Sequence, residues 1–164
     1  MGNSTPGILG RIRQNHAIEH AAMHILAGSV PGLRLFAYSD WTGFLVFGKV
    51  ETIALADAVR EGLLRLRQGE TYLAIHPHCG TNIAVPLGLS GGLLLAAASL
   101  PRAWRFTRLA CVLLAGFTYG IRQPLSAAAQ KYMTTSHDLA RARVLAVTNI
   151  NPRGTPIHRV LLRA

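Results

Sequence analysis

An uncharged stretch in the middle of the chain constrains the fold more than any other feature. No Asp, Glu, Lys or Arg occurs from Thr71 through Pro101, and the eighteen residues Ile83–Leu100 read IAVPLGLSGGLLLAAASL. A helix needs about 17–25 apolar residues to cross a bilayer. The run therefore predicts a membrane-spanning helix, with a buried core helix as the alternative of the same length.

A second apolar run follows a short basic connector. The connector, Pro101–Arg108, holds three arginines, and Leu109–Ile121 then reads LACVLLAGFTYGI. Thirteen residues are too few to span alone, but flanking arginines can direct their charged ends to the headgroups, and the helix can continue through Gln123–Gln130. We therefore predict a two-helix transmembrane hairpin. Small residues four apart predict close helix packing; they are Gly88, Gly92, Gly116 and Gly120.

The charge of the chain agrees with a membrane surface. The chain carries +10 in 164 residues, yet only 15% of them are charged and half are hydrophobic. Disorder is excluded, because a disordered chain combines low hydrophobicity with high charge. Nucleic-acid binding is disfavoured, since the sequence shows neither a basic helix nor an aromatic stacking platform. Many arginines border the apolar runs, where anionic lipids attract them. Two cysteines do not make a disulfide framework.

These features predict an integral protein of the bacterial inner membrane. The first residues, MGNSTPG, lack the pattern of a signal peptide, so the hairpin itself is expected to anchor the chain. More basic residues flank the side of the two termini than lie in the connector, which favours a cytoplasmic soluble part. The expected partners are the lipid bilayer and other membrane-protein subunits, with no nucleic acid. The oligomeric state is left open.

The remaining segments predict a small α+β domain. Ser4 or Thr5 can cap a first helix that Gly28 ends, and helical spacing predicts a second helix over Glu51–Arg67. Runs rich in β-branched and aromatic residues predict strands; they are 33–38, 44–50, 71–76, 142–148 and 157–162. The predicted architecture is a small mixed sheet with two or three helices, interrupted by the hairpin. The predicted domains are 1–80, the hairpin 81–123, and 124–164, which completes the soluble part.

Four titratable side chains recur at helical spacing near the N-terminus. His16, His20 and His24 lie four residues apart, and Glu19 is beside the first two. Histidines four apart on a helix can present two ring nitrogens to one metal ion, and a neighbouring Glu can deprotonate a bound water. The pattern predicts a metal site in which Glu19 is the candidate general base. A surface or core role remains the ordinary interpretation of any single histidine.

A second polar cluster precedes the apolar run. It reads His76-Pro-His78-Cys79-Gly-Thr-Asn82, and it follows the strand predicted over 71–76. Zinc accepts mixed imidazole and thiolate ligands, so His76 and Cys79 are candidate metal ligands together with the helical histidines. The expected ion is zinc or another divalent transition metal. Which of His24, His76, His78 and Cys79 complete the site is left open.

Two resemblances accompany these motifs. The pattern from Asn15 to His24, followed by His-Pro-x-Cys-Gly-Thr-Asn before a hairpin, resembles an uncharacterised family of small bacterial membrane proteins known only as a domain of unknown function. That resemblance implies a two-helix membrane protein with a histidine-rich polar site and supplies no reaction. His16, Glu19 and His20 also resemble the H-x-x-E-H inverted zinc peptidases. Those enzymes take a third ligand from a Glu on a later helix, for which this chain has no recognisable motif.

Two functions therefore remain open from the sequence. One is a membrane-anchored zinc hydrolase or peptidase, with Glu19 activating a metal-bound water. The other is a non-catalytic accessory or assembly subunit of a membrane complex with a structural His/Cys metal site. Ligation of a haem or a chlorophyll-type pigment by histidine is a third possibility, although no C-x-x-C-H motif occurs.

Overall fold

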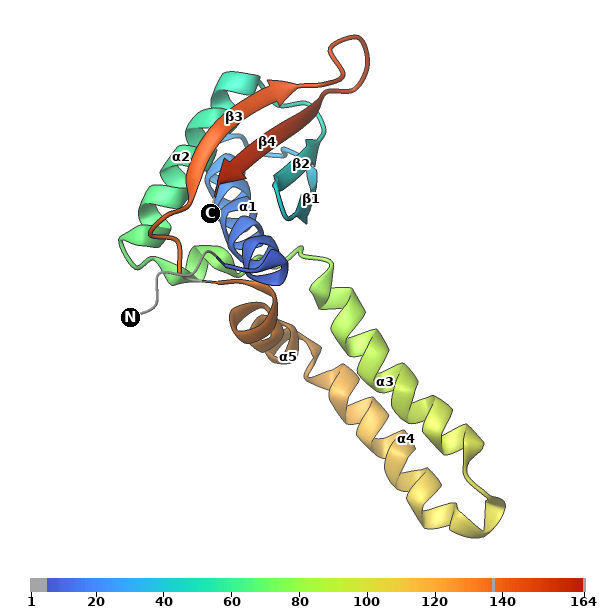
Figure 1. Cartoon of the computed structure of the whole chain (residues 1–164). Coiled ribbons are helices and arrows are strands. Elements are labelled where there is room, and N and C mark those ends of the chain that lie inside the picture. Colours follow the sequence, from blue (N-terminus) through green and yellow to red (C-terminus); the bar gives the residue numbers. More distant parts are fainter. Residues whose placement is uncertain (1–5, 137, 164) are drawn as a thin grey trace. The chain divides into compact units, whose positions relative to one another are not determined.

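The computed structural model describes residues 6–136 and 138–163, and the chain divides into two compact units. The first unit comprises residues 1–76 and 131–164, and the second comprises residues 77–130. Figure 1 labels the helices and strands of both. The fold is α+β, as expected from the sequence, with five α-helices and one four-stranded sheet in the described residues.

The first unit contains two helices and the whole sheet. Its strands have the order β1-β2-β4-β3, and every neighbouring pair is antiparallel. The predicted mixed sheet is therefore wrong, but the strands from either side of the interruption do join one sheet, because β2 pairs with β4. The elements are α1 (Ile8–Ser29), β1 (Phe36–Asp40), β2 (Gly43–Phe47), α2 (Thr52–Arg67), β3 (Arg143–Asn149) and β4 (Ile157–Arg163).

The segment 71–76 is not a strand. Residues Thr71–Ala74 form a short 3₁₀ turn, which follows Gly69 at the end of α2. Leu73 and Ala74 from this turn are buried in the core. A short apolar run does not reveal by its spacing whether it forms a strand or a helical turn. The predicted strand is therefore wrong, because its sequence pattern fits a strand and a helical turn equally well.

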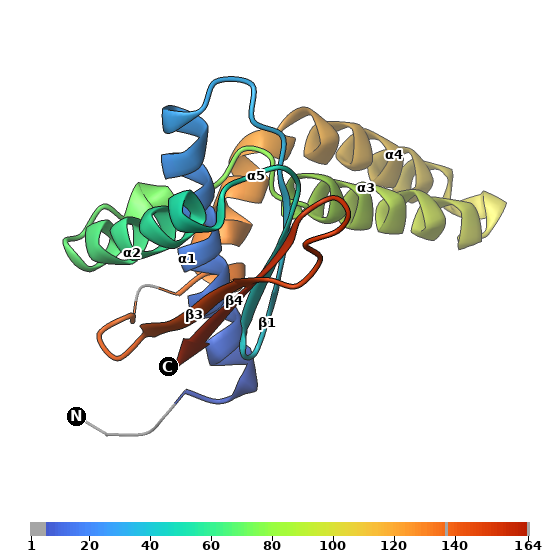
Figure 2. The same cartoon turned by 90° about the horizontal axis from the view of Figure 1, so that it is seen from above.

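The core of the first unit lies between the sheet and its two helices. Figures 1 and 2 show α1 and α2 on one side of the sheet. Gly62 of α2 lies against α1, since a Cβ there would come within 3.0 Å of the Ala21 Cβ. Alternate strand residues point into this core; they include Phe44, Val46, Val160 and Leu162. The predicted caps Ser4 and Thr5 lie outside the described residues, and α1 ends at Ser29, one residue past Gly28.

The second unit is a helical hairpin. Helix α3 (Thr81–Ser99) and helix α4 (Arg105–Gly120) are joined through a 3₁₀ turn at Arg102–Trp104, and α5 (Arg122–Ala129) follows. Within the described residues, α3 is the one helix long and apolar enough to cross a bilayer, and 17% of its apolar window is buried. The predicted continuous second helix is wrong, because the helix breaks at Ile121 before α5.

The glycines do not mediate the packing of the hairpin. A Cβ placed on any of the four predicted contact glycines would meet no atom within 4 Å. The contact uses Ser90 instead, whose Oγ donates to the Ala115 carbonyl at 3.0 Å and lies 2.8 Å from Thr118 Oγ1. The predicted glycine contact is therefore wrong, since spacing alone does not say which face of a helix meets its neighbour.

Candidate metal centre

Helix α1 buries polar side chains inside the core of the first unit. Four of them are buried on this helix; they are Gln14, Asn15, Glu19 and His20. Apolar positions between them, such as Ile18 and Ala21, complete the core contacts. A buried polar group is costly unless it has a hydrogen-bond partner, so the partners of these side chains define the site.

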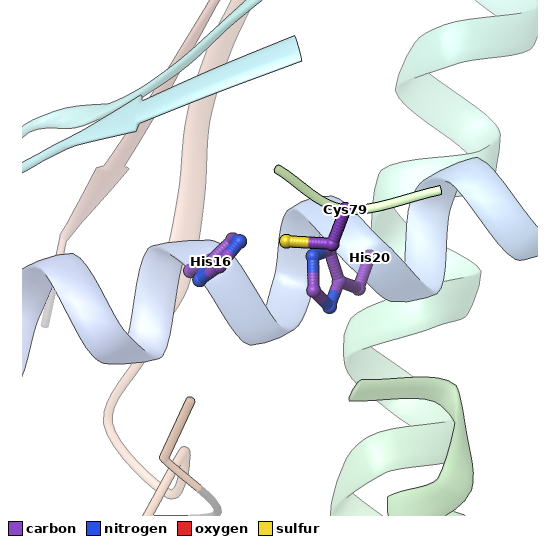
Figure 3. Close-up of side chains that lie close together, drawn as sticks. All are labelled: His16, His20 and Cys79. Carbon is purple, nitrogen blue, oxygen red and sulfur yellow. The ribbon is translucent and has the colours of Figure 1, made fainter. Parts of the chain in front are cut away.

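His16 and His20 lie together on successive turns of α1. Their ring centroids are 4.2 Å apart, in an edge-to-face arrangement. Figure 3 shows these two side chains and also labels Cys79, which belongs to the second unit. The predicted pairing of two histidines four residues apart is therefore present in the first unit.

Each helical histidine has one ring nitrogen at a backbone carbonyl. His16 Nδ1 is 3.1 Å from the Thr134 oxygen, His20 Nδ1 is 2.6 Å from the Ala74 oxygen, and His24 Nε2 is 2.8 Å from the Ile75 oxygen. A carbonyl oxygen only accepts, so the nitrogen facing it carries the proton. In the neutral ring the other nitrogen then holds the lone pair. Metal-binding histidines are commonly oriented by such a bond.

His20 has an unusual second nitrogen. Its Nε2 is buried and has no hydrogen-bond partner among the residues that the structure describes. Leaving a buried acceptor without a partner costs about 1–3 kcal/mol. Because Nδ1 donates to Ala74, this Nε2 is the atom that carries the lone pair. The position is the one that a metal ion would use.

His76 extends the cluster along α1. Its ring centroid is 4.9 Å from that of His24 and 5.7 Å from that of His20. Four of the five predicted ligands therefore lie in one series of imidazole rings within the first unit. The series brings residues 16–24 of α1 beside the segment that follows the 3₁₀ turn.

Cys79 lies at the beginning of the second unit. It is half-buried, and its Sγ accepts a hydrogen bond from Thr81 Oγ1 at 3.1 Å. It follows His76 by three residues, so chain length alone keeps the two Cα atoms within about 11 Å. His78 is exposed. Cys79 thus remains a candidate ligand by its closeness along the chain to His76.

Glu19 lies in a largely buried position next to the histidines. Burial raises the pKa of its carboxyl group, while a hydrogen bond from Ser39 and the nearby His16 act in the opposite direction. Ser39 Oγ donates to Glu19 Oε2 at 2.5 Å. Sequence reasoning missed Ser39, although the alternation of β1 places its side chain toward the helices. The structure thus gives Glu19 a fixed orientation.

Other polar contacts of this helix could not be predicted. Arg13 donates to the carbonyl oxygens of Tyr132 and Thr135, and Gln14 donates to that of Asp138 at 2.5 Å. The sequence signal for buried polar contacts was the run of polar residues Arg13–His16 in a helix that contributes to the core. Their acceptors are backbone groups, which no side-chain pattern reveals.

His158 forms a separate buried group. Its Nε2 lies 3.0 Å from Thr52 Oγ1, and burial lowers its pKa. The sequence assigned it no role, and the structure places it in β4 rather than in the histidine series. His137, which was likewise given no role, lies outside the described residues.

Comparison with known proteins gives a family. Residues 11–147 match the model of a domain of unknown function, DUF6391. An uncharacterised protein of Picosynechococcus sp. is 38% identical over 162 residues, which cover 93% of this chain and 79% of the relative. The chain therefore belongs to the DUF6391 family, which agrees with the resemblance to an uncharacterised family. No solved structure matches.

Proposed function

We propose that this chain is a membrane-anchored protein that binds a divalent transition metal, preferably zinc, through His16 and His20. The observation that carries the proposal is the buried, unpartnered Nε2 of His20, on a ring whose Nδ1 is bonded to the Ala74 carbonyl. His24, His76 and Cys79 are the candidates for the remaining ligands. Imidazole and thiolate together suit zinc better than a hard cation such as magnesium.

The proposed anchor is the hairpin of the second unit. Helix α3 has the length and composition of a span. Large apolar side chains of α3 and α4 are exposed, which suits lipid and is costly in water; they include Leu87, Leu95, Leu109, Leu113 and Phe117. With arginines at its flanks, α4 extends to a second span. The bacterial inner membrane, with the first unit in the cytoplasm, remains the location that we propose.

Elemental analysis tests the metal. Full-length protein purified in detergent is expected to contain about one equivalent of zinc, and a His16→Ala/His20→Ala variant is expected to lose it. His158→Gln is the matched control, because His158 is also buried with one unpartnered ring nitrogen, Nδ1. If the control retains its zinc, the metal is not held by His158, so a buried histidine does not bind zinc merely because it is buried. Absence of metal from the wild-type protein, also after incubation with zinc, would overturn the proposal.

A hydrolytic use of the metal is a second candidate. It is favoured by Glu19, which directly precedes His20, is buried, and is oriented by Ser39. In such a site Glu19 would accept a proton from a metal-bound water. A catalytic zinc keeps one coordination position open, whereas a structural site fills all four with protein ligands.

Cobalt substitution separates the two uses. Azide added to the cobalt protein changes its visible spectrum if a coordination position is open, and leaves it unchanged in a closed four-ligand site. Glu19→Gln is expected to retain the cobalt, since Glu19 is not a proposed ligand and Gln still accepts from Ser39. A closed site and co-purification with other membrane subunits would favour the accessory or assembly role.

A further inference from the structure

The outer face of the sheet is apolar. Residues on this face alternate with those that enter the core, and both helices pack on the opposite side. Phe36 and Tyr38 are 66% and 61% exposed. The apolar side chains on this face include Phe36, Tyr38, Leu45, Phe47, Ile157 and Leu161. Large exposed apolar patches usually mark a binding surface.

The same face is basic at one end. Arg143 of β3 lies directly opposite Arg163 of β4, and both are exposed. Like charges at directly opposite positions in a sheet are destabilising. Arg159 is also on this face, where it pairs with Asp40 at 2.7 Å. Three arginines thus accompany one carboxylate, and an anionic partner would relieve the repulsion between Arg143 and Arg163.

An exposed tryptophan lies at this basic end. Trp41 is in the turn between β1 and β2, and the neighbouring Thr42 accepts a backbone hydrogen bond from Leu162. That bond places the turn beside the end of β4 that carries Arg163. Tryptophan together with arginine is typical of protein surfaces at the headgroup level of a membrane.

We propose that the outer face of the sheet binds the surface of an anionic lipid bilayer. Headgroups would pair with Arg143 and Arg163, while Trp41 and the apolar side chains enter the interface. Three of the six apolar side chains named on this face are aliphatic, namely Leu45, Ile157 and Leu161, and aliphatic side chains suit acyl chains better than stacked bases. Only four residues separate His76 of the first unit from Thr81 of α3. If the hairpin is the anchor proposed above, this tether holds the first unit at the membrane at high effective concentration.

The two tryptophans of the chain provide the test. Trp104→Phe leaves Trp41 as the reporter of the sheet, and Trp41→Phe leaves Trp104 as the reporter of the hairpin. Each full-length variant is reconstituted into vesicles that contain brominated lipid, either neutral phosphatidylcholine or a mixture with anionic phosphatidylglycerol. We expect quenching of Trp41 in the anionic vesicles and much less in the neutral ones.

Charge reversal provides the matched control. Arg143→Glu/Arg163→Glu in the Trp41 reporter is expected to weaken the contact more than about twentyfold and so to abolish quenching of Trp41. Arg60→Glu/Arg65→Glu makes the same change in charge on α2, where both arginines form exposed ion pairs. The control is expected to leave the quenching of Trp41 unchanged.

The outcomes distinguish this inference from the proposed anchor. Quenching of Trp104 without quenching of Trp41 overturns the lipid-binding face and leaves the anchor intact. Equal quenching of Trp41 in neutral and anionic vesicles also overturns it, since charge would then have no role. If the protein instead binds a labelled single-stranded RNA and the Arg143/Arg163 reversal removes that binding while Trp41 stays unquenched, the face is a nucleic-acid surface.

Discussion

Helices α1 and α3 distribute their side chains in opposite ways. Helix α1 buries polar groups, among them Asn15, Glu19 and His20, in the core of the first unit. Helix α3 exposes leucines along most of its length, and its buried residues include Ser90. A water-soluble helix normally does the reverse on both counts. The buried polar groups of α1 and the exposed leucines of α3 are both unfavourable, so each needs an interaction that offsets its cost.

The compensation differs between the two helices. On α1 it is provided by hydrogen bonds to sequence-distant partners, such as the Ala74 carbonyl for His20 and Ser39 for Glu19. Such a buried polar set fixes side-chain orientation, which a binding site requires. On α3 no protein group among the described residues covers the exposed leucines, and the lipid environment proposed for this helix would do so. The comparison separates the proposed metal site from the proposed anchor.

The largest effect is expected from a charge near the centre of α3. Leu89→Arg should oppose membrane insertion by about 2.5–3.5 kcal/mol, because an arginine at the helix centre must enter hydrocarbon. The measurement is the fraction of protein that remains in the membrane after alkaline carbonate extraction. Leu64→Arg on α2 is the matched control, since Leu64 is 50% exposed against 47% for Leu89. Equal membrane retention of both variants would contradict the anchor.

A smaller effect is expected at the polar helix. Ser39→Ala removes the hydrogen bond to the buried Glu19 carboxyl group and should lower the free energy of unfolding by about 1–3 kcal/mol. Denaturant unfolding of the first unit, followed by circular dichroism, measures it. Ser29→Ala is the control, because the hydroxyl of the exposed Ser29 donates to the Ile25 carbonyl of its own helix. Equal unfolding free energies for both variants would show that Glu19 does not depend on Ser39.

His158 predicts a dependence of stability on pH. In the folded state, burial lowers the pKa of His158 below its ordinary value of 6.5. As the pH falls through 6.5, the unfolded chain therefore binds a proton at His158 more readily than the folded chain does. The free energy of unfolding is therefore highest above the pKa that His158 has in the unfolded chain, and it decreases as the pH drops from about 7 to 5. His158→Gln should reduce this fall, measured as unfolding free energy at both pH values. An unchanged fall would show that His158 is not its cause.

The sequence predicted elements better than their contacts. The spacing of His16, His20 and His24 placed them on one helix face, and the apolar run placed α3 within two residues of its ends. The partners of those histidines are backbone carbonyls more than fifty residues away, and every residue type has such a carbonyl. The 3₁₀ turn before His76 was missed because its apolar run resembles a short strand.

The smallest effect should come from the polar contact inside the hairpin. Ser90→Ala removes the hydrogen bond to the Ala115 carbonyl, and contacts of this kind in a membrane contribute about 0.6 kcal/mol on average. In water the loss of a buried hydrogen bond typically costs about 1 kcal/mol. Thermal unfolding in lipid nanodiscs, compared with Ser99→Ala, whose hydroxyl bonds within its own helix turn, measures the difference. A cost as large as that of Ser39→Ala would mean that Ser90 belongs, like α1, to a compensated polar core rather than to a lipid-embedded anchor.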